Sequence, residues 1–146
     1  MNVDIYIKTR LRGSYSEGGY GAAVLEYVTK DGETVTRLYS ETFKNVTNHG
    51  FELAMCNKAL KRLIKPCVVT MHTKDGYIRS AMRNKWPEKW RDNGWKKATG
   101  KTAANIQEWK KLLMLCEVHK VSWEGYDIKY DTELKYALET ERSKDE

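Results

Sequence analysis

The first stretch whose side chains could do chemistry is a basic segment between Arg79 and Lys101. Its eight lysines and arginines face only two acids, so the segment carries +6, the formal charge of the whole 146-residue chain. Concentrated cations attract polyanions, because lysine and arginine contact phosphates and release counterions. Trp86, Trp90 and Trp95 are interleaved with them and could lie against sugars or bases. The alternative is that these tryptophans pack the segment onto the rest of the protein. The bases are Arg79, Arg83, Lys85, Lys89, Arg91, Lys96, Lys97 and Lys101.

The second such stretch is Asn48–Met55, which contains Glu52 near the start of the first expected long helix. A side chain at that position points toward whatever the neighbouring strands present, so its role depends on the residues that face it. Thr47 or Asn48 can cap this helix. The helix dipole would stabilise a carboxylate there even if it had no function. Taken alone, Glu52 therefore identifies no reaction.

The elements that must position these side chains follow from periodicity. Alternating apolar residues predict strands, apolar residues at helical spacing predict helices, and Lys30–Glu33 predicts a tight hairpin because Asp-Gly tolerates positive φ. The expected strands are 3–11, 20–29, 34–42, 66–72 and 119–125, and the expected helices are 47–63, 77–82, 103–116 and 131–141. This β-β-β-α-β-α-α-β-α order predicts an α/β fold with a five-stranded mixed sheet flanked by helices.

The composition is typical of a soluble globular protein, with 40% hydrophobic and 32% charged residues. The length fits one domain, expected over residues 1–142, followed by a short charged tail at 143–146.

No apolar run approaches ~18 residues, which excludes a membrane-spanning helix, and the N-terminus lacks a signal-peptide pattern. Cys56, Cys67 and Cys116 form no CxxC pair, so we expect buried free thiols in a reducing cytoplasm.

Several local strings, taken with this order of elements, resemble the type 1 ribonuclease H family. Residues 18–21 (GGYG) resemble the opening of its second strand, and residues 47–53 (TNHGFEL) resemble its TNNxxEL helix start. Residues 73–78 (TKDGYI) fall where the family has a T-D-S-x-Y-V turn. The spacing of Trp86, Trp90 and Gly94-Trp95 matches its basic, tryptophan-rich protrusion. The resemblance covers almost the whole chain and implies a ribonuclease H-like fold with such a protrusion.

The resemblance also implies an activity, which is cleavage of the RNA strand of an RNA–DNA hybrid by two divalent metals. Three aspartates and one glutamate hold these metals in the family. Mg²⁺ prefers carboxylate and water oxygens, and paired metals activate water and stabilise the leaving oxygen. The family's activity therefore depends on four carboxylates.

Only one of these four carboxylates is present in this sequence. Glu52 matches the family's glutamate, whereas the aspartate positions fall on Lys8, Lys74 and Thr132. Acids lie beside two of them: Asp75 follows Lys74, and Asp131 and Glu133 flank Thr132. The family's glycine- and histidine-containing loop before the last helix is missing as well, since residues 127–130 are too short to hold it.

Two lysines in place of two aspartates invert the charge of the site. A Mg²⁺ about 4 Å from an ammonium group meets a repulsion of several kcal/mol at intermediate dielectric. We therefore expect a degenerate site with no catalytic residue, no metal and no cofactor, in which Lys8 and Lys74 form ion pairs with Glu52. The alternative is that both lysines extend to solvent and Glu52 is a solvated first-turn glutamate.

A further alternative keeps a reduced metal site. Asp75 or Asp131 could turn inward and join Glu52 around one Mg²⁺ or Mn²⁺ ion, which would allow residual nuclease activity. Asp75 equally suits the polar position of a turn or a helix cap.

The nucleic-acid-binding residues that the resemblance implies lie in the protrusion and at the start of the first helix. Asn48 matches a family residue that approaches the minor groove, although it equally suits a helix cap. His49 replaces the family's second asparagine, which weakens that part of the surface. Trp109 and Trp123 are expected in the core, and His72 is expected to be a packed or rim histidine rather than a ligand. The predicted binding residues are Asn48, Lys85, Trp86, Lys89, Trp90, Arg91, Trp95, Lys96, Lys97 and Lys101.

These observations favour a catalytically inactive, cytoplasmic ribonuclease H-like protein that binds RNA–DNA hybrid or double-stranded RNA through the protrusion. A second hypothesis is a protein-interaction module, in which the inert site or the acidic last helix docks a partner. The third and least favoured hypothesis is an active, metal-dependent ribonuclease H that uses Glu52 with Asp75 or Asp131.

Overall fold

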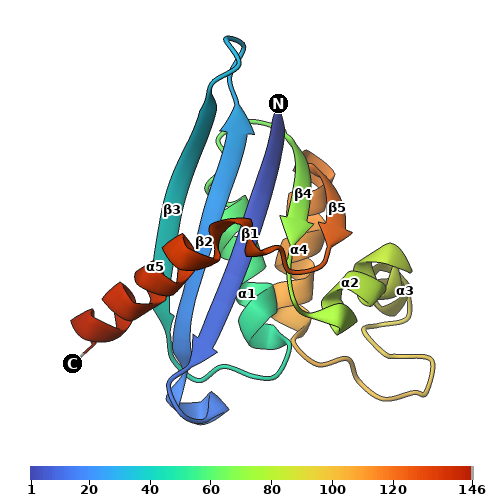
Figure 1. The fold of residues 1–146 in the computed structure, drawn as a ribbon. Coiled ribbons are helices and arrows are strands. Elements are labelled where there is room, and N and C mark those ends of the chain that lie inside the picture. The colour runs from blue at the N-terminus through green and yellow to red at the C-terminus, as the bar shows by residue number, and fades with distance from the viewer. Residues whose placement is uncertain (146) are drawn as a thin grey trace.

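The computed structural model describes residues 1–145 and contains a five-stranded sheet with the strand order β3-β2-β1-β4-β5 (Figure 1). The strands are β1 (Asn2–Leu11), β2 (Gly19–Val28), β3 (Thr34–Phe43), β4 (Val68–His72) and β5 (Lys120–Glu124). β2 pairs antiparallel with β1 and β3, whereas β4 runs parallel to β1 and β5. The predicted mixed sheet is therefore confirmed.

All four predicted helices are present, together with a fifth that the sequence pattern does not predict. The helices are α1 (Gly50–Leu60), α2 (Gly76–Arg83), α3 (Trp86–Asp92), α4 (Ile106–Val118) and α5 (Asp131–Lys144), with short 3-10 helices η1 (Tyr15–Glu17) and η2 (Ile128–Tyr130). The additional helix, α3, is too short to display an apolar repeat. Pro87 lies in its first turn, where a missing N–H costs no helical hydrogen bond. None of the helices among residues 1–145 is long and apolar enough to cross a bilayer.

The start of α1 differs from the prediction. Its N-cap residue is His49, which has φ +62° and makes no side-chain capping bond. The Thr47 hydroxyl instead contacts Asn105 Oδ1 at 2.5 Å, and Asn48 Oδ1 accepts a hydrogen bond from the Tyr15 hydroxyl at 3.3 Å. The two residues predicted to cap the helix are therefore occupied by contacts with η1 and with the residue that precedes α4.

Alternating residues of the central strands send their side chains into two separate cores. On one face, Ile5 and Ile7 of β1 are fully buried beneath α1 and α4, and on the other face Tyr6 packs against α5. Figure 1 shows α5 crossing the sheet on one side while α1 and α4 cover the other. Trp109 and Trp123 are buried in the first of these cores, as predicted.

The last helix packs through a stripe at helical spacing. Its buried residues are Leu134, Ala137, Leu138 and Glu141. This i, i+3, i+4, i+7 pattern is typical of a helix that covers a core with one face. The buried Glu141 carboxylate accepts hydrogen bonds from the hydroxyls of Ser40 and Thr42 at 3.0 and 2.8 Å, so it remains satisfied inside the protein.

The C-terminal end of α5 belongs to the domain. The helix continues to Lys144, past the boundary predicted at residue 142. Asp145 then accepts a hydrogen bond from the Tyr20 hydroxyl at 3.0 Å and forms an ion pair with Arg12. The predicted separate tail is therefore wrong for residues 143–145, while Glu146 lies outside the described residues.

The parallel pairing of β1 with β4 positions the candidate site. Tyr6 lies opposite His72 in the register, so the residues that follow them on the two chains meet at one edge of the sheet. Phe51 and Leu53 in the first turn of α1 are both buried. They hold Glu52 between the end of β1 and the loop after β4.

Replacing Leu134 with alanine should test the buried face of α5. Leu134 is fully buried, so truncation removes apolar contacts and leaves a cavity, and the free energy of unfolding should fall by about 2–5 kcal/mol. Chemical denaturation measures this loss. Tyr136→Ala is the control on the same helix, because Tyr136 is 71% exposed, and it should cost less than about 0.5 kcal/mol. Equal losses in the two variants would contradict this packing.

Candidate functional site

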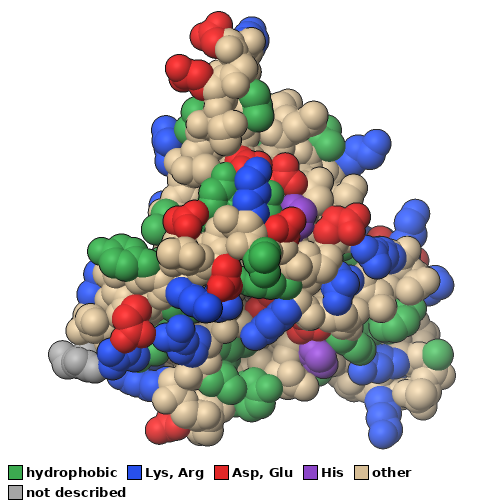
Figure 2. Space-filling view, viewed as in Figure 1, with side chains coloured by type: hydrophobic (Ala, Val, Ile, Leu, Met, Phe, Trp, Pro, Cys, Tyr) green, Lys and Arg blue, Asp and Glu red, His purple; other side chains and the backbone are tan. Residues whose placement is uncertain are grey.

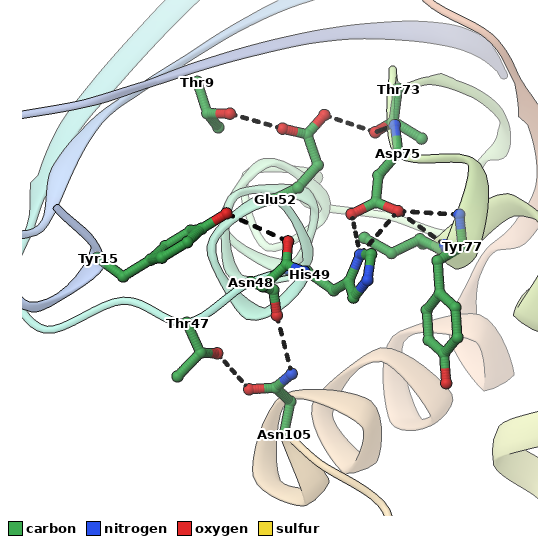
Figure 3. Close-up of polar contacts among 11 residues, drawn as sticks. Thr9, Tyr15, Thr47, Asn48, His49, Glu52, Thr73, Asp75, Tyr77 and Asn105 are labelled. Carbon is green, nitrogen blue, oxygen red and sulfur yellow. Dashed lines mark hydrogen bonds and ion pairs between the residues drawn. The ribbon is translucent and has the colours of Figure 1, made fainter. Parts of the chain in front are cut away.

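Glu52 is buried between β1 and the loop after β4. Its side chain accepts hydrogen bonds from the hydroxyls of Thr9 at 2.8 Å and Thr73 at 2.5 Å (Figure 3). Only 4% of the residue is exposed. Neither prediction for Glu52 is right, because it is not solvated and its partners are hydroxyl groups rather than lysines. Two threonines satisfy the carboxylate without bringing a countercharge.

Lys8 pairs with a different acid from the one predicted. Its ammonium lies 2.8 Å from Asp131 Oδ1 and 3.3 Å from the Tyr126 hydroxyl. The reason is strand alternation: Lys8 lies on the same face of β1 as Tyr6, toward α5, whereas Thr9 lies on the face toward α1. An ion pair between Lys8 and Glu52 would require the two side chains to meet across the sheet.

Lys74 also makes no ion pair with Glu52. Its side chain is exposed and has no ion-pair partner among residues 1–145. The next residue, Asp75, is the N-cap of α2 and accepts hydrogen bonds from the backbone N–H groups of Tyr77 and Ile78 at 3.0 and 3.1 Å. The helix-cap interpretation of Asp75 is therefore confirmed.

Asp75 has one further partner, His49. The Nδ1 atom of His49 lies 2.9 Å from Asp75 Oδ2 and 3.1 Å from Oδ1, and the imidazole is stacked on the Tyr77 ring with centroids 4.5 Å apart (Figure 3). This contact joins the start of α1 to the start of α2. Nothing in the sequence marks His49 as the partner of Asp75, because the two residues lie far apart in the chain.

Asp131 is held by three donors at the start of α5. Oδ1 contacts Lys8 and the Tyr126 hydroxyl, and Oδ2 contacts Lys135 at 3.0 Å. Hydrogen bonds from Lys8, Tyr126 and Lys135 hold the pKa of the Asp131 carboxyl well below its usual value. Burial and the bond to this carboxylate raise the pKa of the Tyr126 phenol, so the hydroxyl remains a donor.

The residues at the four family positions do not fit two divalent metals. Two of these positions carry ammonium groups, and Thr132 is exposed on the first turn of α5, as is its neighbour Glu133. Within residues 1–145, no three His, Cys, Asp or Glu side chains lie close enough together to hold a metal ion. Asp75 and Asp131, which could have joined Glu52 in a one-metal site, contact other partners: Asp75 contacts His49 and caps α2, and Asp131 contacts Lys8 and Lys135. The oxygen ligands that Mg²⁺ prefers are therefore not assembled around Glu52.

A small pocket of about 130 Å³ opens beside Glu52. Its lining combines two carboxylates, an imidazole, an ammonium group and an amide, and the Lys74 ammonium is the group in it that could contact an anionic ligand. We refer to it as the Glu52 pocket, and it is lined by Thr9, Leu11, Tyr15, Asn48, His49, Phe51, Glu52, Lys74 and Asp75. Asn48 is exposed at this site, and its backbone carbonyl accepts a hydrogen bond from Asn105 Nδ2 at 3.4 Å.

Of the three tryptophans in the basic segment, one is buried and two are partly exposed. Trp90 is buried, with its ring edge-on to Trp109 at 5.6 Å. The prediction that it binds nucleic acid is therefore wrong, since its ring lies in the core. Trp86 and Trp95 are half-buried, the first 5.7 Å from the Tyr77 ring and the second beneath the Lys110 ammonium. Part of each of these two rings is exposed to solvent, where it could contact a ligand.

The lysines of the basic segment lie at the surface around α3 and the loop that follows it. Lys97 is placed over the rings of Tyr77 and Trp90 at 5.6 and 5.7 Å. Figure 2 shows Lys and Arg side chains gathered over this part of the molecule. Four exposed lysines have no ion-pair partner within the described chain: Lys85, Lys89, Lys96 and Lys101.

Two arginines of the basic segment, Arg83 and Arg91, form ion pairs with acids, unlike its exposed lysines. Arg83 donates to the Trp123 carbonyl and lies 3.7 Å from Glu124 of β5, so it helps to fasten α2 to the sheet. Arg91, which was predicted to bind nucleic acid, lies 3.5 Å from Asp92, its neighbour in the chain. The free positive charge is therefore mainly that of the lysines.

Four non-glycine residues in or next to the Glu52 pocket and the basic segment have positive φ: His49, Lys85, Trp95 and Asn105. Positive φ is sterically unfavourable for residues with a Cβ atom, so the surrounding contacts must hold each of them in place.

The sheet order, the helices on both faces and the location of Glu52 define an α/β protein of the ribonuclease H-like class. A family model described as RNase H matches residues 3–125. The ribonuclease H of Lachnoclostridium phytofermentans is 34% identical over 131 residues, covering 87% of this chain and 82% of the relative. That of Acetivibrio thermocellus is 33% identical over 121 residues, covering 83% and 78%. The chain belongs to the ribonuclease H family.

Solved structures agree with this fold. LC9-RNase H1, described as a type 1 RNase H with the type 2 active-site motif, has a TM-score of 0.75 at 22% identity, over 95% of this chain and 69% of that chain. A foamy viral protease–reverse transcriptase, solved in complex with RNA/DNA hybrid, has a TM-score of 0.65 at 15% identity, over 94% of this chain and 19% of that chain. Both are matches of fold.

Acid should weaken the contribution of Asp131 to stability. Because the pKa of this carboxyl is lowered in the folded protein, its contacts stabilise the fold fully above the usual value of 3.8, and the contribution is lost as the pH falls below that value. Asp131→Asn should therefore lower the free energy of unfolding near neutrality, and the difference from wild type should shrink on acidification. Denaturation curves at several pH values measure it. Asp31→Asn, at the exposed hairpin tip, is the control, and a difference for Asp131→Asn that is independent of pH would contradict the assignment.

Proposed function

We propose that this ribonuclease H-family protein binds RNA–DNA hybrid or double-stranded RNA through its basic segment and does not hydrolyse it by two-metal catalysis. One observation carries the proposal. The carboxylates near the family's site are engaged with protein donors, whereas the lysines of the basic segment have no acidic partner within the described residues. Lysine or threonine stands at three of the four positions where the family has metal-binding carboxylates. The neighbouring surface carries exposed lysines, which suit contacts with phosphates.

The lysines suit the backbone of a duplex better than they suit a particular base sequence. Flexible ammonium groups contact phosphates as point charges, and each neutralised phosphate releases counterions. The exposed parts of Trp86 and Trp95 lie among these lysines and could contact sugars. The foamy viral protein that shares this fold is described in complex with RNA/DNA hybrid, which supports a hybrid as the first ligand to test.

The proposed lack of hydrolysis rests on the contacts of three acids. Glu52 is enclosed by two hydroxyls, Asp131 is paired with Lys8, and Asp75 caps α2. Recruiting any of them to a metal would break a contact that is present in the fold. The relatives carry the name ribonuclease H, so this chain would be a member of the family that keeps the scaffold and binds without this chemistry.

Binding to a labelled hybrid should depend steeply on salt and on the exposed lysines. Each neutralised phosphate contributes a slope of about −0.9 to the logarithm of affinity against the logarithm of salt concentration. Replacing Lys85, Lys89, Lys96 and Lys101 together with alanine should weaken binding and reduce the magnitude of the slope by about 3.6, since each lysine is expected to neutralise one phosphate. Fluorescence anisotropy over a salt series measures both quantities.

The matched control removes four lysines that are exposed elsewhere on the protein and also have no ion-pair partner in the described structure. These are Lys30, Lys61, Lys65 and Lys120. The control lowers the net charge equally, so equal losses in the two variants would show that the basic segment is not the binding surface. Absence of binding to hybrid, duplex RNA and duplex DNA at about 50 mM salt would instead favour the protein-interaction module.

Incubation of the protein with fully paired hybrid and Mg²⁺ or Mn²⁺ should leave the RNA strand intact. The reason is that Lys8, Lys74 and Thr132 supply no carboxylate to a metal. Gel analysis of a labelled RNA strand checks this, and the Glu52→Gln variant is measured beside the wild type. Metal-dependent cleavage that Glu52→Gln abolishes would contradict the proposal and establish an active enzyme with a non-standard site.

A further inference from the structure

We propose that the Glu52 pocket also cleaves unpaired RNA without a metal, with His49 as general base, Asp75 as its orienting carboxylate and Lys74 as the cation that meets the phosphate. The choice of RNA as substrate rests on the proposed nucleic-acid binding. The chemistry rests on side chains that the two-metal reaction does not use.

His49 is held in one orientation by Asp75. A carboxylate accepts hydrogen bonds and cannot donate them, so Nδ1 of the imidazole carries the proton in the contact at 2.9 Å. The lone pair of the ring is then placed on Nε2. Nε2 has no hydrogen-bond partner among residues 1–145, and 35% of the His49 side chain is exposed. A positioned carboxylate, an oriented imidazole and a free Nε2 form the arrangement of a general base.

The rest of the structure keeps this pair rigid. Asp75 is anchored by the two N–H groups at the start of α2, and the imidazole is stacked on Tyr77 with an angle of 23° between the rings. His49 also has φ +62°. The contact with a carboxylate that is anchored on another helix therefore fixes both the position and the orientation of the His49 ring.

Lys74 supplies the positive charge that phosphate chemistry requires. It lines the same pocket as His49 and has no ion-pair partner within the described structure. Asp75, the next residue, is engaged with His49 and the cap of α2 and therefore leaves the Lys74 ammonium free. An ammonium group beside a phosphodiester stabilises the charge that develops on the non-bridging oxygens during attack.

The proposed step is an internal transesterification that needs no oxidant, no metal and no second substrate. Nε2 of His49 removes the proton of a ribose 2′-hydroxyl, and the 2′-oxygen forms a bond to the adjacent phosphorus. The bond between phosphorus and the 5′-oxygen breaks, and that oxygen takes a proton from water. The products are a 2′,3′-cyclic phosphate and a 5′-hydroxyl, and His49 returns its proton to the solvent.

This mechanism selects unpaired RNA. Attack requires the 2′-oxygen to line up opposite the departing 5′-oxygen, and a regular duplex holds the ribose away from that geometry. A fully paired hybrid would therefore be bound without being cut, whereas a flexible ribonucleotide entering the Glu52 pocket would be cleaved. A strand without a 2′-hydroxyl has no nucleophile for this step.

The test uses a labelled DNA strand with one internal ribonucleotide, incubated with excess protein in EDTA. Cleavage should occur only after the ribonucleotide, and mass spectrometry should find a 2′,3′-cyclic phosphate. His49→Asn removes the base and keeps a residue that tolerates positive φ, and it should slow cleavage by about 100-fold or more. Asp75→Asn, which retains an oxygen acceptor for the α2 cap, and Lys74→Gln should each slow it about tenfold or more.

The control variant is Lys30→Gln, an exposed lysine in the hairpin between β2 and β3, which should cleave at the wild-type rate. Thermal melting verifies that each variant folds, and hybrid binding is measured on the same preparations. No cyclic phosphate from the wild type, or equal rates for wild type and His49→Asn, would overturn the inference even where hybrid binding is intact. Loss of hybrid binding by the four-lysine variant with unchanged cleavage would separate this reaction from the proposed binding surface and support it.

Discussion

The parallel pairing of β1 with β4 is the constraint on which the rest of the site depends. It brings Thr9 and Thr73 to opposite sides of Glu52 and lets their hydroxyls enclose the carboxylate. The same pairing sets which face of the sheet each neighbour occupies, so Lys8 meets α5 and not α1. A buried carboxylate with two neutral donors is stable only if both donors are in place, because an unsatisfied buried acid is costly.

Several acids of this chain have structural roles within the ribonuclease H fold. Asp131 joins β1 to the start of α5 through Lys8, Glu141 joins α5 to β3, and Asp75 starts α2 while holding His49. Each of these carboxylates stabilises the junction between two elements.

Much of this architecture could be predicted from the sequence, because local patterns carry it. Alternation located the strands, helical spacing located α1, α4 and α5, and the positions of Trp109 and Trp123 in amphipathic elements placed them in the core. What could not be predicted are contacts between distant residues. The partner of Lys8 depends on where α5 begins, and burial of Trp90 depends on α4 packing against it. The Asp75–His49 contact arises from two loops that only the folded sheet brings together.

The positive φ values of His49, Lys85, Trp95 and Asn105 have a kinetic consequence. These residues lie in the connecting segments that border the Glu52 pocket and α3, where a freely mobile chain would have to be ordered by its ligand. Here the protein's own contacts already select one backbone conformation, so the loss of chain entropy is incurred during folding. A ligand would then meet a surface close to its final shape, and the rate of encounter would be set mainly by diffusion and charge.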